Sequence, residues 1–143
     1  MENSLKQLSI FIENKSGTLI KVLELFSKAK IQIIASTIAD TQDYGIFRVL
    51  CSSPCRAYTI LKEHGINVQL TDVLAIAIED EPGHAALAIS ALSQAEVNIL
   101  YKYSFLWKGR GVQVMRTEES DKALEVIAEN EMDLHNEDDF IIQ

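Results

Sequence analysis

The chain repeats itself, and this internal repeat constrains the fold more than any other feature of the sequence. An offset of 66 residues, as from Leu8 to Leu74, aligns the two halves of the 143-residue chain without a gap. The matches fall at glycines and apolar positions, where structure restricts the choice of residue most: Ile10 with Ile76, Gly17 with Gly83, Ile33 with Ile99, and Gly45 with Gly111. The repeat predicts two domains, residues 1–70 and residues 71–143.

Each copy has the residue pattern of strand, helix, strand, strand, helix, strand. Alternating apolar residues predict strands, and apolar residues three and four apart predict helices. In the first copy the predicted strands are 7–13, 31–39, 46–51 and 66–70, and the first helix is 18–29. The second helix is expected to start after Ser53, a candidate N-cap followed by Pro54, and to end at His64-Gly65.

The second copy follows the same order. Its predicted strands are 73–79, 97–107, 111–117 and a weak 132–135, and its helices are 84–95 and 119–129. Residues 136–139 are expected to form an acidic turn, and the tail from Phe140 is expected to extend the sheet or to pair across an interface. Two βαββαβ units predict an α+β fold with two ferredoxin-like units, each an antiparallel sheet with both helices on one face.

The face of each predicted sheet that carries no helix is expected to be apolar as well. Tyr101, Tyr103, Phe105 and Trp107 alternate along one side of a strand, and Leu100 and Leu106 lie on the other side. A sheet face that meets water is ordinarily polar. We therefore expect the helix-free face to be covered by a second copy or a second chain, and we expect a homodimer.

Charge argues against nucleic acid as a partner. The net charge is −8, and it is uneven: residues 1–70 sum to +2 and residues 71–143 to −10. Binding to phosphates requires a basic surface instead. The apolar runs are too short to span a membrane, and the start of the chain lacks the features of a signal peptide. We expect no nucleic-acid or membrane partner and a cytoplasmic location.

No catalytic or metal-binding constellation is visible in the sequence. Cys51 and Cys55 have no histidine or further cysteine at metal-ligand spacing, so we expect reduced, buried or half-buried thiols. No nucleophile has a base at motif spacing. The sequence therefore predicts no enzyme, no catalytic residues, no metal and no cofactor.

The turns that lead from the first strand into the first helix of each copy are the candidate binding elements. They are residues 13–19 and 79–85, and each contains a glycine. Glycine permits a sharp turn and lets a ligand reach main-chain N–H groups, which suit a carboxylate at the start of a helix. Asn14 and Asp80 could hold an ammonium group. The spacing alone does not separate this hypothesis from ordinary capped helix starts.

These residues carry a resemblance to a known family. In each copy, five residues with the pattern acidic-[ND]-x-[SP]-G precede an amphipathic helix. The helix leads into the pattern A-x-[IV]-[NQ]-I at residues 29–33 and 95–99. This pattern resembles the ACT domain, twice, over residues 5–70 and 71–142. The copies depart from the family at Ser16, where proline is usual, and at His84, where a small or apolar residue is more common.

The resemblance implies a regulatory module that binds an amino acid, usually between two ACT domains. Carried over by position, it nominates the turn before the first helix and the start of the second strand in each copy. The nominated residues are Asn14, Lys15, Ser16, Gly17, Thr18, Leu19, Gln32 and Ile33 in the first copy, and Asp80, Glu81, Pro82, Gly83, His84, Ala85, Asn98 and Ile99 in the second. With no catalytic domain in the chain, the resemblance also implies a metabolic enzyme regulated in trans.

The carboxylates of Glu79, Asp80 and Glu81 beside the second turn favour a neutral polar or basic amino acid over aspartate or glutamate. The first turn, around Lys15, lacks such a cluster and could reverse this preference if it is the site used. The main alternative is a ligand-free protein-interaction or regulatory subunit of a metabolic enzyme. Other proteins of this strand order fit less well. The arginine-containing anion loop of acylphosphatases, the aromatic RNA-binding pattern with basic neighbours and the C-x2-C loop of metal carriers are all missing from the sequence.

Overall fold

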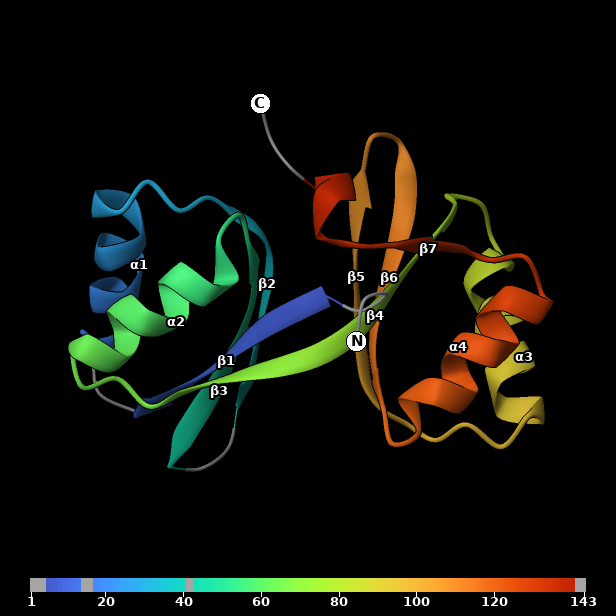
Figure 1. Ribbon diagram of the computed structural model, residues 1–143, viewed down its shortest axis with the longest axis horizontal. Helices are drawn as coiled ribbons and strands as arrows, with labels where there is room; N and C mark the ends of the chain where they lie inside the picture. The colour runs from blue at the N-terminus through green and yellow to red at the C-terminus, as the bar shows by residue number, and fades with distance from the viewer. Residues whose placement is uncertain (1–4, 14–16, 41–42, 141–143) are drawn as a thin grey trace. The chain divides into compact units, whose positions relative to one another are not determined.

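The computed structural model describes residues 5–13, 17–40 and 43–140. The chain divides into two compact units, whose main parts are Lys6–Thr71, here the first unit, and Asp72–Asp139, here the second unit. Each unit is α+β and ferredoxin-like, which confirms the predicted fold class. Figure 1 shows that both helices of a unit lie on one face of its sheet.

In the first unit, the strands are neighbours in the order β2-β3-β1-β4. The elements are β1 (Leu5–Glu13), α1 (Thr18–Lys28), β2 (Ile33–Asp40), β3 (Tyr44–Cys51), α2 (Pro54–Glu63) and the beginning of β4 (Val68–Glu79). Strand β3 pairs antiparallel with both β1 and β2, as in Ile10 opposite Phe47. The crossover from β1 through α1 to β2 therefore places β3 between them.

The second unit repeats this order as β5-β6-β4-β7, and all these pairs are antiparallel. It uses the end of β4, α3 (His84–Gln94), β5 (Ile99–Trp107), β6 (Arg110–Thr117), α4 (Ser120–Glu129), β7 (Asp133–His135) and the 3-10 helix η1 (Glu137–Phe140). Strands β5 and β6 are joined through Lys108 and Gly109, both with positive φ, which matches the twist of a two-residue hairpin.

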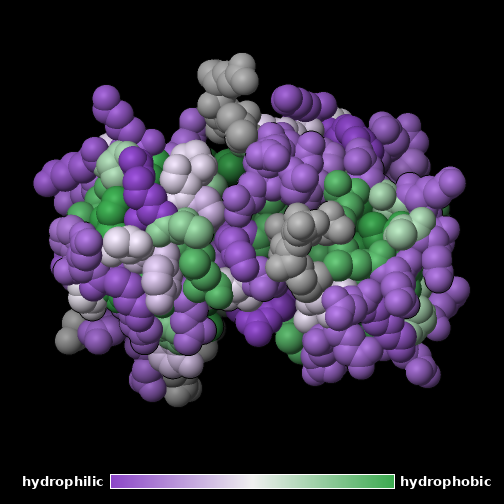
Figure 2. All heavy atoms as spheres, in the orientation of Figure 1, coloured by the Kyte–Doolittle hydropathy of each residue, from purple (hydrophilic) through white to green (hydrophobic). Residues whose placement is uncertain are grey.

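Each core forms where the first strand of a unit packs beneath two helices. In the first unit the buried cluster includes Leu8, Ile10, Val22, Phe26, Ala57 and Leu61. In the second it includes Leu74, Ile76, Leu92, Met115, Ala123 and Val126. The helical residues recur three and four apart, so a single stripe of each helix faces the sheet. On the face drawn in Figure 2, hydrophilic residues dominate, interrupted by apolar patches.

All four helices end in the same backbone motif. The residue after each C-cap has positive φ: Lys30 (57°), Gly65 (73°), Glu96 (61°) and Glu131 (53°). The next residue donates its N–H five positions back, as from Ile31 to the Phe26 carbonyl at 2.9 Å and from Met132 to that of Ile127 at 3.0 Å. These are Schellman closures, which satisfy the last carbonyls of a helix and direct an apolar residue back toward the core.

Several sequence predictions need correction. Strands predicted separately at 66–70 and 73–79 form one strand, β4, because no glycine or proline breaks the chain between them. Ser53 occupies the N-cap of α2, but its side chain makes no capping hydrogen bond. Cys55 is exposed, although Cys51 is buried and both are free thiols.

The predicted acidic turn is the 3-10 helix η1. Asn136 and Asp139 stabilise it through side-chain hydrogen bonds to nearby main-chain N–H groups. Phe140 is buried at its end and does not extend the sheet as a strand. The rest of the predicted tail, residues 141–143, lies outside the described residues.

The alternation predicted for the aromatic strand agrees with the register. Tyr103 and Phe105 stand opposite Val114 and Val112 on β6. The four aromatic side chains of β5 are half-buried, whereas Leu100 and Leu106 on its other side are exposed. The half-buried side of this strand is therefore aromatic, whereas its exposed side combines two leucines with Lys102 and Ser104.

We predict that Glu131→Gly stabilises the protein by about 0.5–1 kcal/mol, because glycine adopts the left-handed conformation without the strain that a Cβ brings. Glu131 is exposed, so the substitution removes little packing. Urea unfolding measures the change. The matched control is Gly65→Ala at the equivalent residue of the first unit, where a Cβ would meet nothing within 4 Å. It should destabilise by about 1 kcal/mol, and equal effects of the two variants would contradict the argument.

Candidate functional site

The two predicted turns deliver Gly17 and Gly83 directly before helices α1 and α3. Their φ values are +115° and +92°, which only glycine adopts readily. A Cβ at either position would meet nothing within 4 Å among the described atoms. These glycines are therefore required by the backbone conformation and not by crowding. Residues 14–16 of the first predicted turn lie outside the described residues.

Both helices begin without a side-chain cap from the described part of the chain. The first main-chain bonds run from Lys21 N to Gly17 O at 2.9 Å and from Leu87 N to Gly83 O at 3.0 Å. The N–H groups of the residues in between have no partner within the helix by geometry, and the positive end of the helix dipole adds to their field. In the second unit the turn is partly closed, since His84 N donates to Glu81 O at 3.3 Å.

Of the residues predicted at the start of the second strand, Gln32 and Asn98 are exposed, and their main chains are hydrogen-bonded. Gln32 N donates to Ser52 Oγ at 2.9 Å, and Gln32 O accepts from Ser52 N at 2.9 Å. In the second unit Asn98 O accepts from Glu118 N at 3.1 Å. Ile33 and Ile99 start β2 and β5, and both pack partly against their own cores.

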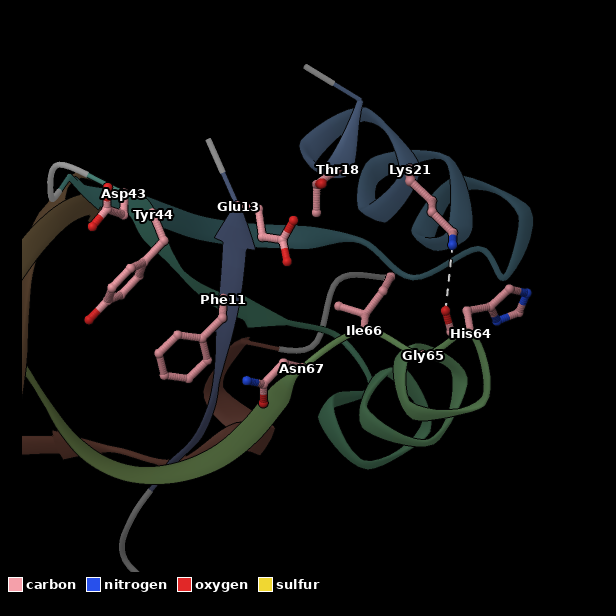
Figure 3. A pocket seen from close by; sticks show the side chains of 10 residues that line it. All are labelled: Phe11, Glu13, Thr18, Lys21, Asp43, Tyr44, His64, Gly65, Ile66 and Asn67. Carbon is pink, nitrogen blue, oxygen red and sulfur yellow. Dashed lines mark hydrogen bonds between the residues drawn. The ribbon is translucent and has the colours of Figure 1, made fainter. Parts of the chain in front are cut away.

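Each unit contains a hollow beside its helix start. The first hollow has a volume of about 710 Å³ and lies among the end of β1, the first turns of α1, the start of β3 and the turn from α2 to β4. Figure 3 shows its lining side chains. The second hollow, of about 420 Å³, lies among the corresponding elements of the second unit. Both volumes are in the range of small-molecule sites.

The two hollows are built from equivalent positions. Every lining residue of the first except Asp43 has its counterpart, 66 residues on, in the lining of the second. The pairs are Phe11 and Ala77, Glu13 and Glu79, Thr18 and His84, Lys21 and Leu87, Tyr44 and Arg110, His64 and Asn130, Gly65 and Glu131, Ile66 and Met132, and Asn67 and Asp133. The repeat of the sequence thus extends to a repeat of the cavity.

The first hollow contains both signs of charge. Glu13 reaches in from β1 and Lys21 from α1, as Figure 3 shows, and Asp43 lies at the start of β3. The Lys21 ammonium donates to the His64 carbonyl at 3.5 Å. The rings of Phe11 and Tyr44 lie with their centroids 5.9 Å apart.

The second hollow is dominated by Arg110. Its guanidinium donates to a carboxylate oxygen of Asp133 and to the Ala77 carbonyl at 3.0 Å, and it lies 3.7 Å from Glu79. The hydrogen bond from Arg110 holds the pKa of Asp133 below its ordinary value, against the opposing effect of burial. His135, 3.3 Å from the same carboxylate, lowers it further.

Of the sixteen residues nominated from the sequence, only Thr18 and His84 line a hollow among the described residues. The nomination by motif missed Lys21, Tyr44 and Asn67 and their counterparts, and it left out Glu13 and Glu79 although both stand at the start of the predicted turns. A signal for them was present. The 66-residue offset, applied to the charged residues as well as to the glycines, pairs Glu13 with Glu79 and exposes the replacement of Tyr44 by Arg110.

Two further features bear on function. Within the described residues, no group of three or more His, Cys, Asp or Glu side chains could hold a metal ion. None of the helices described in residues 5–13, 17–40 and 43–140 combines the length and apolar character needed to cross a membrane.

Comparison with known proteins gives one family and several related structures. The family model described as an ACT domain pair matches residues 3–142. A solved protein from Bacteroides thetaiotaomicron is 39% identical, with a TM-score of 0.93, over 99% of this chain and 98% of that one. No curated protein matches the sequence.

The fold is shared with regulatory subunits of aspartate kinase. That of Thermus thermophilus, in its ligand-free form, is 15% identical with a TM-score of 0.62, and the alignment covers 87% of this chain and 91% of that one. That of Thermus flavus is also 15% identical, with a TM-score of 0.58, over 87% and 90%.

We predict that Asp133→Asn destabilises the protein at pH 7 by no more than about 1 kcal/mol, the range of partly exposed ion pairs. Since the folded pKa of Asp133 is lowered, its contribution is present above the unfolded pKa of about 3.9 and is lost as the pH falls through the folded value. Thermal unfolding of both proteins between about pH 7 and pH 2.5 should show the difference close with acid. The matched control, Asn67→Asp, has Tyr44 in place of the arginine and should gain no stability. A difference that persists at the acid end would contradict the ion-pair assignment.

Proposed function

Because the chain belongs to the ACT domain pair family, we propose that it is a non-catalytic regulatory protein that binds a free amino acid. One ACT domain is assigned to residues 1–70 and the other to residues 71–143. The protein acts as a sensor, with the amino acid as allosteric effector and no cofactor. Its expected location is the cytoplasm.

The observation that carries this proposal is the hollow beside each uncapped helix start. A zwitterionic amino acid needs hydrogen-bond donors for its carboxylate and acceptors for its ammonium group. Both sets must lie close together, because the two groups are attached to the same carbon atom. In the first unit, the first-turn N–H groups of α1 and Lys21 supply donors, and Glu13 and Asp43 supply acceptors. The hollow is large enough for such a ligand.

The contacts that we propose extend from the hollow to the turn residues nominated by sequence. Thr18 and Leu19 start α1, and His84 and Ala85 start α3, so their main chains are the donors. The exposed side chains of Gln32 and Asn98, at the starts of the second strands, are proposed to contact ligand held against a paired ACT domain.

The balance of charge supports a neutral polar or basic amino acid. The first hollow has Glu13 and Asp43 against Lys21, and the second has Glu79, Glu131 and Asp133 against Arg110. Both therefore carry an excess of negative charge when histidine is neutral, and an acidic ligand side chain would be repelled.

The regulated partner is proposed to be a metabolic enzyme that the protein contacts in trans. The related aspartate kinase structures are regulatory subunits, and regulation by a separate chain is what we propose here. The second candidate function is a regulatory subunit that works through protein contacts without a ligand. The exposed Leu100 and Leu106 of β5 favour that candidate.

We predict a homodimer that buries the helix-free face of the sheet, together with exposed apolar side chains of β5. Leu106 on β5 is 65% exposed and Leu100 is 48% exposed. Strand β5 is also an edge strand in the order of described pairs, so a second chain could pair with it. Sedimentation velocity at micromolar concentration should give a species of about twice the chain mass of 16.0 kDa. A single species at the mass of one chain would contradict this.

We predict that calorimetric titration with the twenty common amino acids, one at a time, gives heat with at least one neutral polar or basic member. At about 0.7 kcal/mol for each of about nine heavy atoms, the expected Kd is on the order of 10–100 μM. Absence of heat with every amino acid would favour the ligand-free alternative. Aspartate or glutamate binding more tightly than all others would refute the charge argument.

A further inference from the structure

The second hollow already holds a cation of the protein's own. Arg110 places its guanidinium against the Glu79 carboxylate, the Asp133 carboxylate and the Ala77 carbonyl. Two of the three guanidinium nitrogens of the partly buried Arg110 thus donate to groups that line the cavity, and its buried Nε has no hydrogen-bond partner among the described residues. A guanidinium is permanently charged, so the cation itself is present at any physiological pH and without any metabolite.

The first hollow has oxygen-bearing groups at the same repeat positions but no arginine. Glu13 replaces Glu79, the main chain of Phe11 replaces that of Ala77, and the Asn67 amide replaces the Asp133 carboxylate. Tyr44 stands where Arg110 would be, and its ring packs against Phe11 at 5.9 Å. Figure 3 shows Glu13, Phe11 and Asn67 around one side of this hollow.

From this comparison we infer that the first hollow binds the ammonium group of the amino acid at the place where the second hollow holds the guanidinium of Arg110, and that the second hollow takes no ligand. The inference rests on the proposed function and adds to it the occupied site and the orientation of the ligand. The guanidinium of Arg110 thus marks, in the second hollow, the position that we assign to the ammonium group of the ligand in the first.

Both units offer helix N–H groups to the carboxylate end of the ligand, and the first hollow adds a lysine that the second lacks. Lys21 projects from α1 into the first hollow, within 3.5 Å of the His64 carbonyl, whereas its counterpart Leu87 is apolar. The first hollow therefore has a cation and carboxylates separated by the cavity, which fits a zwitterion. The second has its cation paired already and an apolar residue at the other end.

The replacement of Asp133 by Asn67 also bears on the kind of ligand. Two carboxylates and a carbonyl surround the guanidinium in the second hollow, and one carboxylate, one amide and a carbonyl position correspond to them in the first. A primary ammonium group has three donors and a single charge. One carboxylate and two neutral acceptors satisfy it fully, so the site matches an α-ammonium group better than a second guanidinium.

Exchange of the distinguishing residues between the hollows tests the inference. The wild-type protein, titrated by calorimetry with each of the twenty common amino acids, is expected to bind one ligand per chain. The double variant Tyr44→Arg/Asn67→Asp rebuilds the internal ion pair in the first hollow and should weaken binding at least 100-fold. The converse variant Arg110→Tyr/Asp133→Asn empties the second hollow, and it should leave binding at the first within twofold.

Single substitutions test the same inference in case a double variant fails to fold. Glu13→Gln should weaken binding at least tenfold, and Lys21→Leu, which copies the second unit, should do the same. The matched control Glu79→Gln should change the affinity less than twofold, although it removes a partner of Arg110. Circular dichroism and thermal unfolding check that each variant is folded.

The outcomes separate this inference from the proposed function. A wild-type protein that binds two ligands per chain, or equal losses for Glu13→Gln and Glu79→Gln, would overturn the inference and leave amino-acid binding intact. Unchanged binding by a folded Tyr44→Arg/Asn67→Asp variant would overturn it as well. A wild-type protein that binds none of the twenty amino acids would overturn both.

Discussion

In each unit, the buried side chains of one strand pack beneath both helices: Leu8 and Ile10 in the first unit, Leu74 and Ile76 in the second. This packing fixes where the strand ends and therefore where the chain must turn into its first helix. The carboxylate at that end, Glu13 or Glu79, is delivered to the hollow as a result. The Schellman closures position the other wall of each hollow, because the turn after α2 or α4 lines it.

One frame thus carries two different sets of side chains. The backbone devices are kept in both copies, including positive φ at Gly17 and Gly83 and left-handed residues after every helix. The side chains that face the hollows have diverged in charge, as Tyr44 and Arg110 illustrate. The ACT domain pair is consequently a repeat in its architecture without being a repeat in its chemistry.

The fold was predictable from the sequence because its signals are local and repeated. Periodic apolar residues such as Val22 and Phe26 predict a buried helix face, and both are buried. The hollows were not predictable in the same way, since their walls come from four segments whose proximity depends on tertiary packing. Motif position led to the glycine turns, which begin at Glu13 and Glu79, but not to Lys21 or Tyr44 in the same hollow. The continuity of β4 was missed because strand ends carry weak signals where no glycine or proline marks them.

The Arg110 ion pairs also affect how each unit depends on its surroundings. A partner on the same chain is present at a constant effective concentration, so the second unit gains its stabilisation at the moment of folding and keeps it whatever the cell contains. A cavity filled from solution behaves differently, because its unit is stabilised by an amount that grows with the logarithm of free ligand above the dissociation constant. Under the proposed binding, the second unit would have constant stability, and the first would be most stable when its ligand is abundant.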